Sequence, residues 1–166
     1  MSDHGFKKEH DDAISCLGLF VVGWSTIEAL LEVAIAKQLG LAPAEGSIVT
    51  ASLQFKSRSV ILMGLLNRDK TKNAAAIALL KTLQNKPDRN DLLHSIIGRS
   101  KTGLVFTRRK SDGKFSSQEK PHDAGSLLLA TIELTEIANQ IKDALGISEP
   151  DIQTYFDAAH KAANSA

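Results

Sequence analysis

A long run of apolar residues at helical spacing dominates the first quarter of the chain. Between Asp11 and Gly40 the apolar side chains recur every three or four residues, the period of an amphipathic α-helix rather than of a strand. They are Ile14, Leu17, Phe20, Val21, Trp24, Ile27, Leu31 and Ile35. Asp11 or Asp12 supplies a start signal and Gly40 a stop signal. The pattern therefore predicts a long first helix whose apolar stripe packs against further helices.

Most of the remaining chain continues the helical pattern. The expected helices cover about 47–53, 55–67, 74–84, 122–146 and 149–159. Within 55–67 we expect the apolar side chains, Val60 and Ile61 among them, to be buried, and Lys56 and Arg58 to be solvated.

One segment interrupts the helices. Leu104–Thr107 is rich in β-branched and aromatic residues, Ser111-Asp112-Gly113 is a hairpin turn signal, and Lys114–Ser116 can return as a second strand. We therefore predict an all-α fold, an up-and-down helical bundle with a small β-hairpin inserted at about 103–118 and a short C-terminal helix. Residues 1–166 are expected to form a single domain with its core at about 11–145.

Composition bears on the cell compartment in which the protein is expected. The chain has 166 residues, a formal net charge of +1 and one cysteine, Cys16, which excludes an internal disulfide framework. The first twelve residues are polar and charged, and we expect no apolar run near the roughly 20 residues that cross a bilayer. The sequence thus predicts a cytoplasmic protein without a membrane partner.

The stretch from Lys86 to Gly98 carries the most unusual polar residues. Asp88 is a good N-cap and Gly98 a plausible stop, so Arg89 falls at the start of a short apolar helix. Arg89 projects from near the centre of the apolar arc of that helix, and a buried guanidinium needs an anion or a set of carbonyl groups.

Glu28 offers one acceptor for that guanidinium. It lies within the apolar arc of the first helix, whereas Glu32 lies at the margin of the arc. Periodicity thus places Glu28 and Arg89 each on a buried face, and we predict that they form an ion pair. The pair either fixes the register of two helices or orients Arg89 toward a phosphate.

The predicted hairpin is strongly basic. Between Arg99 and Lys120 there are seven Lys or Arg residues and two acids. Residues expected to bind RNA phosphates are Arg99, Lys101, Arg108, Arg109, Lys110 and Lys114. The alternative is a solvated hairpin tip without a ligand.

The segment Arg89-Asn90-Asp91-Leu92-Leu93-His94 resembles the Arg-polar-x3-His motif of the HEPN superfamily of α-helical proteins. Many members are metal-independent ribonucleases of toxin–antitoxin, phage-defence and RNA-processing systems. The resemblance covers roughly residues 11 to 145, including Trp24-Ser25-Thr26-Ile27-Glu28 in the first helix.

This resemblance implies a site and a mechanism. His94 would act as general base or general acid, Arg89 would stabilise charge on the phosphate, and Asn90 would position it, without metal or cofactor. It also implies a homodimer in which the 86–98 helices of two copies form one composite site. An antitoxin or a nucleotidyltransferase-type protein is a further partner that it implies.

Two other functions remain open at this stage. The chain could be a non-catalytic helical interaction protein. In that case Arg89, Asn90 and His94 would form polar contacts with one another or with a second copy at a dimer interface. Alternatively, it could be an RNA-binding module without cleavage that uses the basic hairpin. The sequence shows no ligand spacing for a metal ion, and we expect His4, His10, His122 and His160 on the surface.

Overall fold

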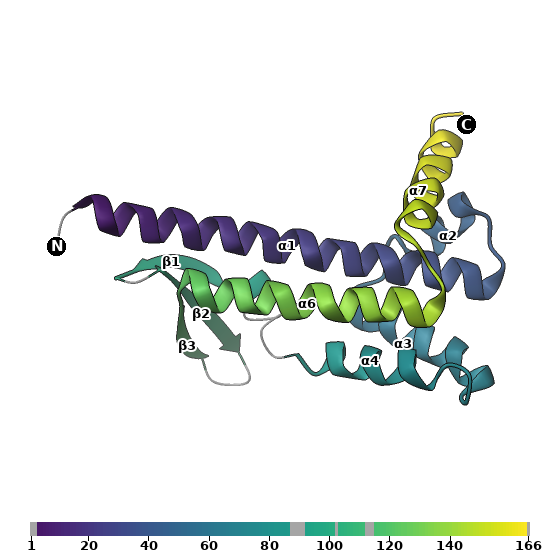
Figure 1. Cartoon of the computed structure of the whole chain (residues 1–166), viewed down its shortest axis with the longest axis horizontal. Helices are drawn as coiled ribbons and strands as arrows, with labels where there is room; N and C mark the ends of the chain where they lie inside the picture. The colour runs from purple at the N-terminus through teal and green to yellow at the C-terminus, as the bar shows by residue number, and fades with distance from the viewer. Residues whose placement is uncertain (1–2, 87–91, 102, 112–114, 166) are drawn as a thin grey trace. The chain divides into compact units, whose positions relative to one another are not determined.

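The protein is mainly helical, with one small antiparallel sheet (Figure 1). The structure is a computed structural model that describes residues 3–86, 92–101, 103–111 and 115–165, with the backbone alone at 3–7, 109–111 and 115. Its elements are α1 (Asp3–Leu39), α2 (Pro43–Thr50), α3 (Phe55–Leu66), η1 (Asn67–Asp69), α4 (Ala74–Gln84), β1 (Ile96–Ser100), β2 (Gly103–Ser111), β3 (Phe115–His122), α6 (Ala124–Leu145) and α7 (Glu149–Ala163). The predicted mainly helical class is confirmed.

The chain divides into two compact units. Unit 1 contains Met1–Trp24 and Lys86–Thr135, and unit 2 contains Ser25–Asn85 and Glu136–Ala166. The division falls inside α1 and α6, so both helices contribute one part to each unit. The single domain over 1–166 stays a prediction.

Unit 1 contains the sheet, whose strand order is β1-β2-β3. The predicted hairpin is confirmed as β2 and β3, which pair from Leu104 with His122 to Ser111 with Phe115. Strand β1 was not predicted. It adds to the free side of β2, with Ile96 opposite Thr107.

The helix predicted over 86–98 is wrong in its second half. Residues 92–94 are helical, but β1 begins at Ile96, and the predicted stop Gly98 lies opposite Val105 inside the strand. The physical reason is the β-branched pair Ile96 and Ile97, which favours a strand wherever a neighbouring strand such as β2 is available. Residues 87–91, with the predicted N-cap, lie outside the described residues.

The core of unit 1 joins α1, the sheet and α6. Its buried apolar residues are Ala13, Phe20, Trp24, Leu92, Leu104, Phe106, Leu127 and Leu134. The rings of Phe20 and Trp24 stack with centroids 6.3 Å apart. Gly103 permits the sheet to approach the chain before α6, because a Cβ there would lie 2.4 Å from the carbonyl oxygen of His122.

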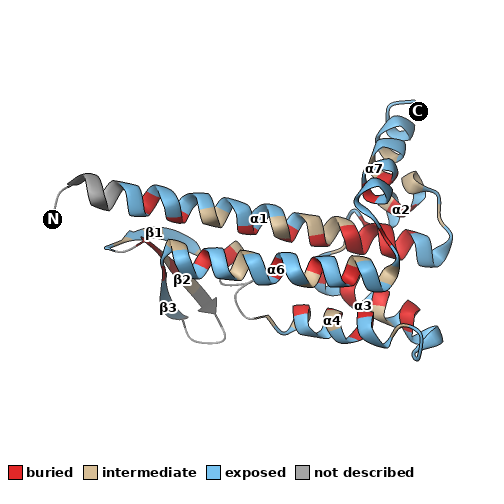
Figure 2. Ribbon diagram, viewed as in Figure 1, coloured by how far each residue is buried: buried red, intermediate tan, exposed pale blue. Residues whose placement is uncertain are grey.

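In unit 2, α1 is the central helix. Every residue from Leu30 to Ala36 is buried, whereas the part of α1 before Trp24 alternates between buried and exposed positions (Figure 2). Helices α2 and α7 pack closely, since a Cβ on Gly46 would lie 2.3 Å from the Tyr155 hydroxyl. A helix that is buried all round must satisfy any charge that it carries inside the protein.

Helix α3 confirms the predicted helix and part of its predicted buried face. Val60 and Ile61 are 52% and 37% exposed, whereas Ser59 and Leu62 are fully buried. In the last turn, Leu65 and Leu66 are buried as predicted, so the prediction is wrong at Val60 and Ile61. The stretch contains apolar residues on both sides, so its pattern alone did not identify the packed side.

The predicted stops of the two long helices are confirmed. Gly40 and Gly146 have φ values of +66° and +59°, and each follows the last turn of its helix. Leu41 N donates to Ala36 O at 3.0 Å, and Ile147 N donates to Lys142 O at 3.0 Å. Both ends are Schellman motifs, in which glycine takes the left-handed position without steric cost.

Helix α1 also bears on the expectation about membranes. Between Lys8 and Leu39 it is long and apolar enough to span a bilayer by length and composition, a test that the core helix of a water-soluble protein also passes. The expectation that no apolar run has this length is therefore wrong. The cytoplasmic location stays a prediction.

Candidate functional site

His94 is exposed where a helical turn leads into the sheet. It is the last residue of the helical turn 92–94, which Leu92 anchors with only 2% of its surface exposed. Ser95 follows, and β1 begins one residue later. The imidazole of His94 is therefore accessible to a solute.

The other residues of the predicted catalytic motif cannot be placed beside it. Arg89 and Asn90 lie outside the described residues, so the Glu28–Arg89 ion pair also stays a prediction. Glu28 belongs to unit 2 and is half-buried.

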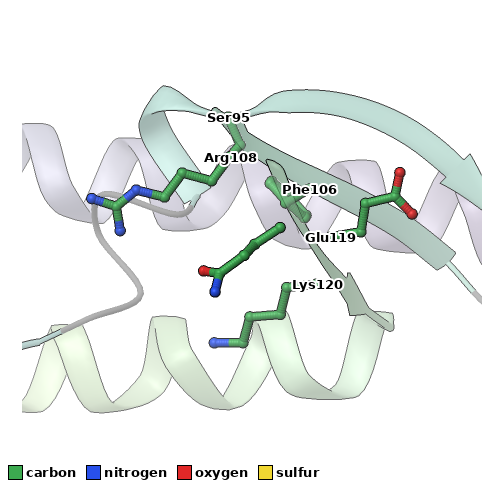
Figure 3. A pocket seen from close by; sticks show the side chains of 6 residues that line it. Ser95, Phe106, Arg108, Glu119 and Lys120 are labelled. Carbon is green, nitrogen blue, oxygen red and sulfur yellow. The ribbon is translucent and has the colours of Figure 1, made fainter. Parts of the chain in front are cut away.

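A groove of about 320 Å³ opens on the sheet of unit 1, and Ser95, the residue directly after His94, is part of its lining (Figure 3). It is lined by Ser95, Phe106, Arg108, Gln118, Glu119 and Lys120. Arg108 lies opposite Gln118, and Phe106 lies opposite Lys120, so these four side chains share one face of the sheet. Ile96 lies opposite Thr107, which brings the preceding Ser95 beside Arg108.

On one face of the sheet, the charged side chains that line this groove are both cationic. Arg108 and Lys120 reach to one side of the sheet, and the Glu119 carboxylate extends to the other (Figure 3). The two cations occupy diagonal positions on neighbouring antiparallel strands, where side chains are about 7–8 Å apart. Side chains as long as these can therefore converge on one anion.

Neutral donors accompany the two cations. The Ser95 hydroxyl oxygen is buried in the groove wall and has no hydrogen-bond partner among the residues that the structure describes. Gln118 adds an exposed amide. Hydroxyl, amide, guanidinium and ammonium groups together form a donor set suited to phosphate oxygens.

The floor of the groove is rigid and apolar. Phe106 is 1% exposed, and the His122 ring meets it edge to face with the centroids 5.2 Å apart. Because the Phe106 ring is covered, it cannot serve as a stacking platform for a base.

The predicted RNA-binding residues fall into three groups. Arg108 lines the groove, and Arg99 and Lys101 are exposed near the connection between β1 and β2. The side chains of Arg109 and Lys110 and the whole of Lys114 lie outside the described part.

Three groove residues were missed by the sequence reasoning, namely Ser95, Gln118 and Lys120. Gln118 and Lys120 could have been found from their spacing. They lie four and two residues before His122 in β3 and therefore share its face of the sheet, which becomes clear once the hairpin register is known. Ser95 gave no such signal because β1 was not predicted.

Two histidines predicted on the surface are buried, so that prediction is wrong for them. His10 is 7% exposed on α1, and His122 is 9% exposed at the end of β3. His122 shares the inward face with Leu104 and Phe106, and His10 falls on a buried position of α1. Asp123, next to His122, caps α6: its carboxylate accepts from Ser126 N at 2.7 Å, and this hydrogen bond lowers the pKa of Asp123.

Unit 2 contains a different polar group, centred on Glu32. Sequence periodicity placed Glu32 at a margin, but it is 7% exposed and accepts a hydrogen bond from the Ser47 hydroxyl at 2.6 Å. Arg58, predicted to be solvated, forms an ion pair with Glu32 at 3.9 Å and donates to the carbonyl oxygens of Glu28 and Thr50 at 3.3 and 3.1 Å.

Tyr155 covers this group from α7. Burial raises the pKa of its hydroxyl, and the charge of Glu32 adds to the effect. The side chains of Glu32, Ser47, Arg58 and Tyr155 come from α1, α2, α3 and α7. We infer that this polar group holds the four helices together.

A second pocket of about 320 Å³ lies in unit 2 beside α7. Its charged groups already have structural partners: Lys37 Nζ donates to Gly146 O at 2.9 Å, and Asp151 accepts from the capping residue Ser148 at 2.7 Å. The hydrogen bonds from Ser148 lower the pKa of Asp151. The groove in unit 1, which two cations line directly after the exposed His94, is the better candidate for a site.

Among the described residues, no group of three or more His, Cys, Asp or Glu side chains could hold a metal ion. No protein-family model, curated protein or solved structure matches this chain. The resemblance to the HEPN superfamily therefore rests on the sequence motif alone and stays a prediction.

Proposed function

We propose that the protein is a metal-independent endoribonuclease of the HEPN type that uses His94. The observation that carries this proposal is the exposed His94 directly before Ser95, which lines a groove with Arg108 and Lys120. An imidazole that solvent can reach, followed by a phosphate-binding donor set, suits attack within an RNA backbone.

The proposed chemistry is transfer of a phosphodiester to its own ribose. His94 accepts the proton of the 2′-hydroxyl, the O2′–P bond forms, and the P–O5′ bond breaks. The leaving 5′-oxygen takes a proton from a general acid. The products are a 2′,3′-cyclic phosphate and a 5′-hydroxyl, and no step needs an oxidant or a reductant.

One copy of the chain provides a single motif histidine, so we propose a homodimer. A second copy would supply the imidazole with the complementary role, and Arg89 and Asn90 would bind the phosphate under attack. Ile96 and Ile97, 51% and 47% exposed just after His94, lie on opposite faces of β1, so each face offers one exposed apolar side chain to such a partner. In this proposal the contact surface would include the turn at 92–94 and strand β1 rather than a full 86–98 helix.

The same proposal includes the biological class. A ribonuclease of this type would be a toxin or phage-defence component in the cytoplasm, held in check by an antitoxin or a nucleotidyltransferase-type partner. RNA would be its substrate.

The test is cleavage of a mixed RNA pool by purified protein in EDTA, with the product ends analysed. We expect cyclic-phosphate ends from the wild type and a loss of about 10²–10⁴-fold in rate for His94→Ala. His160→Ala, which changes another exposed histidine on α7, is the matched control and should cleave normally.

The outcomes separate the alternatives. Cleavage that persists in His94→Ala contradicts the proposal. RNA binding without any cleavage supports a binding module, which the cationic groove also favours. If neither the wild type nor His94→Ala cleaves RNA, and His94→Ala is markedly less stable than the wild type, the result supports a helical interaction protein.

A further inference from the structure

The groove beside His94 suggests how much RNA the site must hold. We propose that Arg108 and Lys120 bind the phosphodiester next to the one that is cleaved, so that efficient cleavage requires a second phosphate. This inference rests on the proposed ribonuclease function and identifies its substrate as an RNA chain recognised through its backbone.

The first step of the argument is position. Ser95 begins the groove wall one residue after His94, and Arg108 and Gln118 continue across the neighbouring strands β2 and β3. Strands in a sheet lie about 4.8 Å apart, so this row of side chains leads away from His94 over roughly two strand spacings. A phosphate in the groove is therefore adjacent to the reacting phosphate rather than identical with it.

The second step is charge. Arg108 and Lys120 lie on one face at diagonal positions, while Glu119 projects to the opposite face (Figure 3). The face that carries the groove thus offers two cations, the Gln118 amide and the buried Ser95 hydroxyl, and it keeps the nearby carboxylate away from an anion. A single phosphodiester can accept from several of these donors at once.

The third step is the absence of a base platform among the six groove residues. The one aromatic ring is that of Phe106, which is 1% exposed. Recognition in the groove would therefore follow the backbone and would be tolerant of base sequence. This distinguishes the groove from a nucleobase pocket.

The experiment compares a dinucleoside monophosphate with the same molecule carrying one added phosphate at its 5′ or its 3′ end. For the wild type, we expect the phosphate at one of the two ends to raise kcat/KM by roughly ten- to hundredfold, the range for a hydrogen bond to a charged group. The gain should disappear in Arg108→Gln/Lys120→Gln, so that the ratio of the two kcat/KM values, with and without the added phosphate, falls to about one. Arg68→Gln/Lys81→Gln, which removes two exposed cations of unit 2, should keep the full gain.

A binding measurement keeps the inference testable if no RNA is cleaved. We would measure the salt dependence of affinity for a fluorescent 2′-O-methyl oligonucleotide, which lacks the attacking hydroxyl. Loss of the contacts with this one phosphate should reduce the slope of log K against log salt by about 0.7 in the Arg108→Gln/Lys120→Gln protein.

The two failures are distinguishable. Absent cleavage with the expected change in slope overturns the ribonuclease function and leaves the phosphate site in place. Equal slopes in folded wild type and variant, or an equal gain from the added phosphate in both proteins, overturn the groove as a phosphate site.

Discussion

Arginine occurs in two contrasting polar groups of this protein. Arg58 in unit 2 is held by the carboxylate of Glu32 and by two backbone carbonyl oxygens, in a site where little solvent enters. Arg108 in unit 1 shares an open groove with a second cation, Lys120, and the neighbouring Glu119 projects to the other face. The first arrangement pairs opposite charges inside the protein, and the second places two cations along one groove.

The difference indicates different roles. A buried ion pair contributes little net stability, yet removal of one partner is costly because the other charge is left unpaired. Like charges near each other in an open groove lower their mutual repulsion when an anion binds between them. We therefore interpret Glu32 and Arg58 as structural residues, and we keep the ligand-binding role of Arg108 and Lys120 as a proposal.

The largest effect on stability is expected at Glu32. Glu32→Gln leaves Arg58 buried without its carboxylate, and the free energy of unfolding should fall by about 3–5 kcal/mol. The matched change is Glu133→Gln in the exposed Lys86–Glu133 pair, which should cost at most about 1 kcal/mol. Urea denaturation of both variants measures the difference. Equal losses would contradict the structural role of the buried pair.

A smaller effect is expected where α2 meets α7. In Gly46→Ala the new Cβ would lie 2.3 Å from the Tyr155 hydroxyl and 2.7 Å from the Ala36 Cβ, so the variant should lose about 1–3 kcal/mol. Gly64→Ala in α3 is the control, because a Cβ there meets nothing within 4 Å. It should gain about 0.5–1 kcal/mol from helix propensity. The same denaturation measurement applies, and a Gly46→Ala protein as stable as wild type would refute the close contact.

The smallest effect is expected at the start of α6. Hydrogen bonds from Ser126 lower the pKa of Asp123 in the folded protein below its ordinary value of 3.8. The stabilisation by ionised Asp123 is therefore fully present above that value and is lost as the pH falls through the folded-state pKa. Asp123→Asn, which keeps an N-cap side chain, should lose less stability than wild type between about pH 5 and about pH 2. Identical pH dependence in denaturation curves would contradict this assignment.

Much of the fold could be predicted from local signals. The apolar spacing of α1 and α6 and the glycines at 40 and 146 identified long helices and their C-terminal ends, whereas α1 begins at Asp3 and not at the predicted Asp11 or Asp12. The hairpin was predictable because β-branched residues and a turn signal occur together. Strand β1 was not, because Ile96 and Ile97 fit a helix as well as a strand until β2 is present to pair with them.

The candidate site was less predictable for a related reason. His94 and Arg108 stood out by residue type, but Lys120 and Gln118 join them only through the register of β3. Likewise, the burial of Glu32 was not predicted, because α1 is buried on all sides from Leu30 to Ala36. On such a helix, a single apolar stripe no longer distinguishes inside from outside.

The most direct test of the account compares His94→Ala and Glu32→Gln in one experiment, with RNA cleavage in EDTA and urea denaturation measured on each protein. The account predicts that His94→Ala is as stable as wild type within about 0.5 kcal/mol, as for an exposed residue, and loses cleavage. Glu32→Gln should unfold at lower urea yet cleave normally per folded molecule. The reverse pattern, with stability lost at His94 and cleavage lost in folded Glu32→Gln, would contradict the division of roles between the two units.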